Sequence, residues 1–282
     1  AWDDEPPWFA ADLTQARLRV LWRQGRYQEY LNLARAEGCI ASYVTLLVHT
    51  GQADRALQEG LHLLTDADQA LQLAQALQDA GRLEAAILIA EHGLTLPGDK
   101  LDLATWLCDL FVGMGDTRRA LSAALVVLRE APSLGAYMRV QELAGDSWSQ
   151  LCPVLLSALR QQQHNPLYVA PCVEIFLHEG LLDEAIAAVE GQSSLDHALL
   201  AIVADAAIEQ RPEWVIRVAC AQAERIIAAA KAARYAHAIT WLERARNAYR
   251  AAGRQTEWQD YYRQLVEQHK RKYALMELLR AL

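Results

Sequence analysis

A glycine that recurs at nearly regular intervals constrains the fold of this chain more than any other feature. From Gly25 to Gly180, successive copies lie 26, 30, 34, 30 and 35 residues apart, and a small residue, usually alanine, follows the clear copies five positions later. The clear copies are Gly51, Gly81, Gly115 and Gly180, and looser ones begin at Gly25, Gly145 and Gly253. A repeat of this length predicts stacked helix pairs that bury their apolar faces against their neighbours.

Each recurring glycine follows a segment with helical spacing of apolar residues. Leu103, Leu107 and Leu110, for example, precede Gly115. Glycine adopts the left-handed conformation that ends a helix, and an acidic residue such as Asp116 suits the start of the next one. The sequence therefore predicts a turn at each glycine, and the small residue that follows lets the second helix approach the first closely.

Three phrases resemble the tetratricopeptide repeat. They are Gly-Arg-Leu-Glu-Ala-Ala (81–86), Gly-Leu-Leu-Asp-Glu-Ala (180–185) and the closing Arg-Glu-Ala-Pro (129–132). The resemblance extends over about residues 12–210 and implies an all-α, TPR-like α-α superhelix, a solenoid of antiparallel helix pairs, over residues 12–211. Members that bind a peptide carboxylate carry lysine, arginine and asparagine on the first helix of each pair. Those helices carry almost none here, so we do not expect such a clamp.

Longer phrases carry a second, narrower resemblance. Glu-Ala-Pro-Ser-Leu (130–134), Val-Gln-Glu-Leu-Ala-Gly (140–145), Glu-Ile-Phe-Leu-His-Glu-Gly (174–180) and the segment 271–282 resemble the helical C-terminal region of bacterial SWIM zinc-finger proteins. The resemblance implies that the Cys-x-Cys and Cys-x-His finger of that family precedes this chain. It further implies that the chain is the helical repeat part of a larger protein.

The pattern changes at Pro212, which suits a first helical turn. An alanine-rich helix is expected to follow, then helices over about 235–252 and 255–269 and a short apolar tail. Because a solenoid needs its end covered, we interpret residues 212–282 as a basic helical capping bundle packed on the array. Residues 1–11 are acidic and contain proline, which indicates a linker or N-terminal extension.

The net charge of −8 is divided unevenly along the chain. Residues 212–282 contain 13 Lys/Arg and 7 Asp/Glu, whereas residues 1–211 contain 14 and 28. Basic residues interleaved with aromatic ones can bind nucleic acid through phosphate contacts and stacking. The candidate contacts for a polyanion or a partner are Arg244, Arg246, Arg250, Arg254, Lys270, Arg271 and Lys272. The competing interpretation is that these cations complement helix C-termini or the acidic array.

No motif nominates a catalytic, cofactor or metal site. The sequence contains no GxGxxG, P-loop, GxSxG or HExxH pattern, and its five cysteines form no CxxC pair. His49, His92 and His178 each lie just before a glycine turn or beside one, where an imidazolium favours a helix C-terminus. We therefore expect neither an enzyme nor a small-molecule substrate.

Two functions remain in competition. The first is a scaffold that binds a protein partner or another domain of the same polypeptide, and the second is a nucleic-acid-binding accessory module acting through the basic C-terminal block. Apolar residues come in short helical spacings without a run of about 18, so no membrane partner is expected. The absence of a leader-like start favours a cytoplasmic location.

Overall fold

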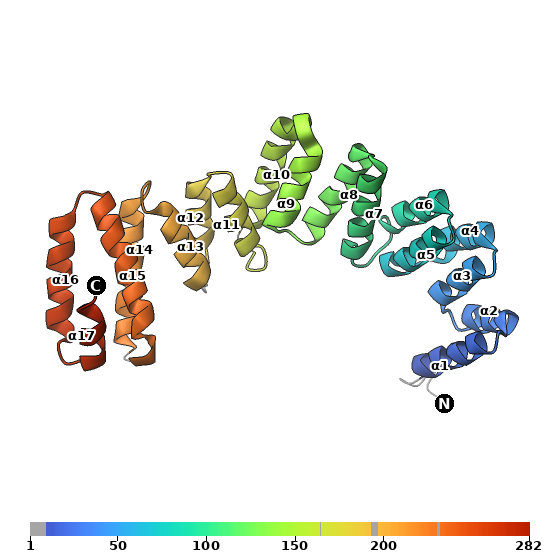
Figure 1. The fold of residues 1–282 in the computed structure, drawn as a ribbon, viewed down its shortest axis with the longest axis horizontal. Coiled ribbons are helices and arrows are strands. Elements are labelled where there is room, and N and C mark those ends of the chain that lie inside the picture. Colours follow the sequence, from blue (N-terminus) through green and yellow to red (C-terminus); the bar gives the residue numbers. More distant parts are fainter. Residues whose placement is uncertain (1–9, 164, 193–196, 230–231) are drawn as a thin grey trace, which may run out of the picture. The chain divides into compact units, whose positions relative to one another are not determined.

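The computed structural model describes residues 10–163, 165–192, 197–229 and 232–282 (Figure 1). These residues form helices and connecting turns and include no strand, so the all-α prediction is confirmed. The α-helices are α1 (Ala10–Arg23), α2 (Tyr27–Ala36), α3 (Ile40–His49), α4 (Ala53–Leu63), α5 (Ala67–Asp79), α6 (Leu83–Gly93), α7 (Leu101–Met114), α8 (Thr117–Glu130), α9 (Leu134–Ala144), α10 (Trp148–Gln162), α11 (Val169–His178), α12 (Leu182–Glu190), α13 (His197–Ala207), α14 (Pro212–Ala228), α15 (Tyr235–Ala251), α16 (Gln255–His269) and α17 (Tyr273–Leu279). Two 3-10 helices are η1 (Gly145–Ser147) and η2 (Ala232–Arg234).

The chain divides into two compact units, Ala1–Leu151 and Cys152–Leu282. The division falls inside α10, one residue before Pro153, which lacks the N–H that would continue the hydrogen bonding of that helix. The expected domain boundary at 211/212 falls within the second unit and stays a prediction. Of the expected linker 1–11, residues 1–9 lie outside the described residues, and Ala10 and Ala11 belong to α1.

In the first unit, consecutive helices pack as hairpins and then stack in two rows. α3 packs with α4, α5 with α6 and α7 with α8. Between hairpins, α3 contacts α5, α5 contacts α7, and α4 contacts α6. α3, α5 and α7 therefore lie beside one another in one row, and α4 and α6 lie beside one another in the other.

The second unit repeats the same local packing. α11 packs with α12 and with α13, and α14 packs most extensively with α15. Pro212 is the first residue of α14, as the sequence predicted. α15 and α16 end within one residue of the expected bounds, and the apolar tail forms α17, which packs on α15 and α16.

All seven recurring glycines have a positive φ. The values are 68° at Gly25, 79° at Gly51, 73° at Gly81, 75° at Gly115, 49° at Gly145, 71° at Gly180 and 70° at Gly253. Six of them match the left-handed region that closes a helix, while Gly145, with ψ −125°, leads instead into η1. The backbone here needs glycine because a Cβ atom is strained at positive φ.

The small residues that follow these glycines lie at the helix contacts. Ala56, Ala86, Ala120 and Ala185 are each fully buried. Because an alanine side chain ends at Cβ, the two helices of a hairpin can pack closely at these points. The aromatic side chains divide: Tyr43, Phe111, Tyr137 and Phe176 are core residues, whereas others remain exposed, among them Trp22.

Candidate functional site

The predicted basic contacts of the second unit are largely engaged within the chain. Arg244 of α15 binds Asp205 of α13 through Nε at 2.7 Å and Nη2 at 2.8 Å. Its guanidinium also lies 5.0 Å from the ring centroid of Trp241. Arg244 thus binds both carboxylate oxygens of Asp205 and lies near the ring of Trp241. It thereby joins α15 to α13.

Two further candidates, Lys272 and Arg246, donate to backbone carbonyls in the last turn of a helix or shortly after it. Lys272 donates from Nζ to the carbonyl of Ile227, in the last turn of α14, at 2.6 Å. Arg246 donates to the carbonyl of Leu282, and Tyr262 donates to that of Leu279 at 2.6 Å. Cationic and hydroxyl donors at these positions satisfy carbonyls that have no intrahelical partner.

Two more of the predicted basic contacts, Arg254 and Lys270, pair with glutamates. Arg254 pairs with Glu213 of α14 and Glu257 of its own helix, and its guanidinium lies 5.7 Å from the centroid of Tyr249. Those hydrogen bonds raise the pKa of Arg254 further above its usual value. Lys270 pairs with Glu267.

Arg250 and Arg271 form no ion pair or side-chain hydrogen bond within the described ranges, and both are exposed. Arg246, Arg250 and Arg254 are four residues apart along the chain, yet only Arg250 of the three is an exposed, uncommitted cation. Of the candidate polyanion contacts, Arg250 and Arg271 therefore remain as isolated charges without a partner among the described residues.

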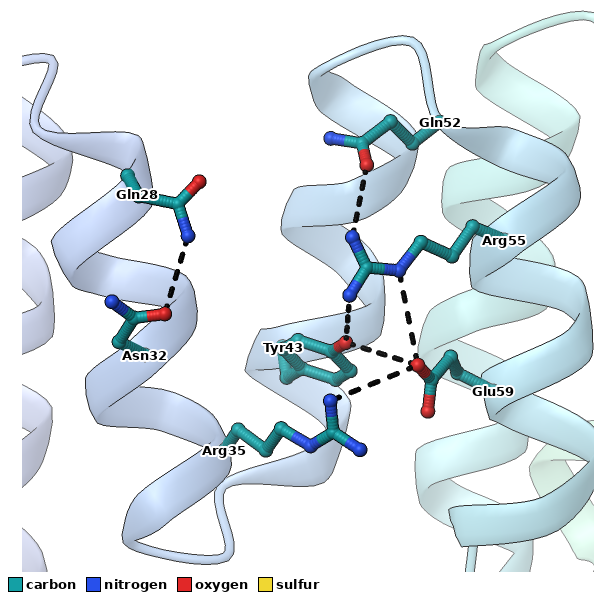
Figure 2. A network of polar contacts seen from close by, with 7 residues as sticks. All are labelled: Gln28, Asn32, Arg35, Tyr43, Gln52, Arg55 and Glu59. Carbon is teal, nitrogen blue, oxygen red and sulfur yellow. Dashed lines mark hydrogen bonds and ion pairs between the residues drawn. The ribbon is translucent and has the colours of Figure 1, made fainter.

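A polar network in the first unit connects three consecutive helices around a buried tyrosine (Figure 2). Tyr43 of α3 accepts a hydrogen bond from Arg55 at 3.1 Å and donates one to Glu59 at 3.3 Å. Arg55 and Arg35 both approach the same carboxylate oxygen, at 3.8 and 3.9 Å. Figure 2 shows the side chains converging from α2, α3 and α4, so the network fixes how these helices pack.

Other parts of this network are local to one helix or its start. Gln52, the residue before α4, accepts from Arg55 at 3.2 Å and thereby orients the guanidinium. Gln28 donates to Asn32 at 3.2 Å one turn along α2, apart from the cluster around Tyr43 (Figure 2).

A similar device recurs between α6 and α8. In the network around Tyr43, the guanidinium of Arg35 lies 5.6 Å from the centroid of the Tyr43 ring while it pairs with Glu59 of the neighbouring even-numbered helix. Arg119 of α8 binds Glu91 of α6 through Nε at 3.1 Å and Nη2 at 2.6 Å, and it lies 4.2 Å from the ring centroid of Phe111. An arginine on an aromatic face thus joins neighbouring even-numbered helices. This repetition indicates a role in packing for both clusters.

Three of the odd-numbered helices of the first unit, α3, α5 and α7, have a different surface. α3, α5 and α7 contain four aspartates and neither lysine nor arginine, while the arginines of this region lie on or at the start of α2, α4, α6 and α8. One exposed stripe runs along α5 and another along α7. We call these stripes together the α5–α7 face: Asp68, Gln72, Gln75 and Asp79, with Asp102, Thr105, Asp109 and Val112.

A pocket of about 310 Å³ opens beside the α5–α7 face, among α7, α8 and the start of α9. Its apolar lining includes Cys108, Val127 and Ala136, and its polar lining includes Asp109 and Arg139. Burial raises the pKa of the Cys108 thiol, so this group is neutral at physiological pH. The pocket is thus an apolar depression with one acidic and one basic group in its lining.

Sequence reasoning did not single out the pocket or the four aspartates. The signal for the aspartates was present: residues 67–79 and 101–114 lack lysine and arginine, and Asp102 and Asp109 are spaced i, i+7 on one helical face. The pocket carried no such signal, because residues 30 positions apart in sequence, such as Asp109 and Arg139, line it together.

Within the described ranges, no three or more His, Cys, Asp or Glu side chains are grouped so as to hold a metal ion. None of the described helices combines the length and apolar character that a membrane span requires. Comparison with protein-family models and with curated proteins found no match to this chain.

Proposed function

We propose that this chain is a non-enzymatic scaffold for protein–protein interaction. In this proposal its antiparallel helix pairs form a TPR-like α-α superhelix, and residues 212–282, which contain α14–α17, cover the C-terminal end. The observation that supports this proposal most strongly is the packing of helices in two rows in the first unit. Because α5 and α7 lie beside each other, their exposed stripes form one surface. Such a surface suits an extended macromolecular partner.

The phrases shared with SWIM zinc-finger proteins support a place for this chain as the helical repeat part of a larger protein of that kind. The binding partner would then be a separate protein or another domain of the same polypeptide. In either case the recognised surface is a helix face, and the location in the proposal is cytoplasmic.

Nucleic-acid binding through the C-terminal block is the weaker alternative. Arg244 and Arg254 are engaged by carboxylates, and Arg246 and Lys272 by backbone carbonyls. A phosphate would have to compete with these partners, and phosphate contacts by Lys and Arg supply most non-specific affinity.

Affinity recovery of the tagged chain from a bacterial lysate, with and without nuclease, tests the proposal. Protein partners recovered in stoichiometric amount after nuclease treatment are the expected result. Retained nucleic acid that salt releases, with no protein partner, would favour the alternative. In that case the double variant Arg250→Glu and Arg271→Glu should lose the nucleic acid, since these two cations are uncommitted.

A further inference from the structure

We infer that the α5–α7 face and its adjoining pocket bind a peptide segment of a protein partner in which an apolar side chain is flanked by lysine or arginine. The inference rests on the proposed scaffold function and specifies the chemistry of the partner. It assigns the apolar side chain to the pocket and the cationic side chains to the aspartates.

The pocket fits a single large apolar side chain. Its volume of about 310 Å³ lies at the lower end of the range of about 300–1,000 Å³ that ligand pockets occupy. The neutral Cys108 thiol, Val127 and Ala136 contribute apolar surface to it. Val112 of α7 is 38% exposed and lies one turn after Cys108, so apolar surface continues along α7 beyond the pocket.

The charge around the pocket favours a cationic segment. Arg139, the basic group of the lining, binds Glu142 at 2.8 Å and is thereby compensated. Asp109 has no such partner: its carboxylate forms no ion pair or hydrogen bond within the described ranges. The net charge that a bound segment meets at the pocket is therefore negative.

The negative charge extends along both helices of the face. Like Asp109, the carboxylates of Asp68, Asp79 and Asp102 are exposed and form no ion pair or hydrogen bond with any described residue. Two carboxylates on the even-numbered helices contrast with them, since Glu59 and Glu91 are both held by arginines. Uncompensated charges of one sign attract a partner of the opposite sign and repel one of the same sign.

Selection of short random peptides displayed on phage against the full chain tests the inference. The enriched peptides should combine an apolar residue with neighbouring lysine or arginine, and a synthetic copy of one of them, labelled with fluorescein, is then the probe. Its affinity is measured by fluorescence anisotropy at low and at physiological ionic strength.

Two variants address the two parts of the site, and one serves as control. Asp109→Lys reverses the charge at the pocket and should weaken binding of the probe by about tenfold or more. Ala136→Phe fills the pocket and should weaken it by a similar factor. Glu84→Lys makes the same charge change at an exposed position of α6 and should leave binding nearly unchanged. If Ala136→Phe fails to fold by circular dichroism, Thr105→Tyr, at an exposed position of the lining, replaces it.

The outcomes separate this inference from the proposed function. Enrichment of acidic or purely apolar peptides, no enrichment at all, or equal weakening by Glu84→Lys and Asp109→Lys would overturn the inference. Partners recovered from lysate at equal yield with wild type, Asp109→Lys and Ala136→Phe would also overturn it while leaving the scaffold function supported. If the wild-type chain recovers no protein partner in stoichiometric amount, the result would instead count against the scaffold function itself.

Discussion

Arg211 holds Asp183 through two parallel hydrogen bonds, from Nε to Oδ1 at 2.8 Å and from Nη2 to Oδ2 at 2.7 Å. Arg211 is the residue before α14, and Asp183 lies in the first turn of α12. In the first unit, Arg82, the residue before α6, likewise forms an ion pair with Asp54 in the first turn of α4, through Nη2 and one carboxylate oxygen. An ion pair between the starts of neighbouring even-numbered helices is therefore a recurring link between hairpins.

The first prediction concerns this pair. The hydrogen bond from Arg211 lowers the pKa of Asp183 below the usual aspartate value of about 3.9. Because the folded pKa is the lower one, the pair stabilises the fold above that pH, and the stabilisation is lost as pH falls through the folded pKa. Asp183→Asn should lower the melting temperature slightly at neutral pH, less so in high salt, and not at all in strong acid. Thermal unfolding followed by circular dichroism across pH measures the melting temperature.

The control for this prediction is Glu174→Gln, at an exposed position of α11. An equal loss of melting temperature in the control would contradict the role of the Arg211–Asp183 pair.

The second prediction concerns a close helix approach. A Cβ atom on Gly93 would lie 2.4 Å from Cβ of Ala70, which is fixed to the backbone of α5. Gly93→Ala should therefore lower the free energy of unfolding by about 1–3 kcal/mol, as overpacking does. Gly113→Ala, in α7 with open space around the new methyl group, should instead raise it by about 0.5–1 kcal/mol. Urea unfolding compares the two, and a loss at both positions would exclude the packing explanation.

The third prediction concerns the repeat turns. Gly81 has φ +73° with nothing near its missing Cβ, so conformation alone requires glycine there. Gly81→Ala should cost about 1–2 kcal/mol, and Gly81→Asn should cost less, because asparagine tolerates the left-handed region. Gly135→Ala, a helical position with open space, is the control and should not destabilise. Equal stability of Gly81→Ala and the wild type, measured by urea unfolding, would disprove the requirement.

The fourth prediction concerns the network in Figure 2. Tyr43 is 2% exposed, and its hydroxyl bonds both Arg55 and Glu59. Tyr43→Phe should cost about 0.5–1.5 kcal/mol, the usual net value of an intramolecular hydrogen bond. Tyr27→Phe, at a site 43% exposed, should change stability little. The two variants are compared by urea unfolding, and a Tyr43→Phe variant as stable as Tyr27→Phe would show that the network does not stabilise the fold.

The fifth prediction concerns a buried thiol. Burial raises the pKa of Cys172 to about 11. Since the unfolded thiol ionises near its usual value of about 8.5, stability should be fully present below that pH and fall as pH rises towards 11. Cys172→Ala should remove this part of the alkaline loss, which chemical unfolding across pH detects. Alkylation by iodoacetamide at mildly alkaline pH should be slow at Cys172 in the folded chain and fast in urea, and fast labelling of the folded chain would contradict its burial.

Local features of the fold were predictable from sequence because they depend on backbone preference and neighbouring residues. The positive φ of Gly81 and Gly115, the helix start at Pro212 and the burial of Ala86 and Ala120 each follow from residues within one turn. Of the candidate site, only the amino-acid composition of its helices could be read from the sequence. The segments 67–79 and 101–114, which lack lysine and arginine, were visible in the sequence, whereas the pocket beside them was not.

The sequence by itself determined where the helices end and which small residues face the helix contacts, because glycine and alanine act through their own backbone and size. Only the tertiary structure decided what the charged groups do. Arg244 meets Asp205 from 39 positions away, and Arg246 meets the carbonyl of Leu282 from 36. Asp109, seen in sequence only as one more acidic residue, is left without an ion pair at the rim of a pocket. A charge acquires its role from the partner that packing brings within hydrogen-bond distance, and packing depends on the whole stack of helices.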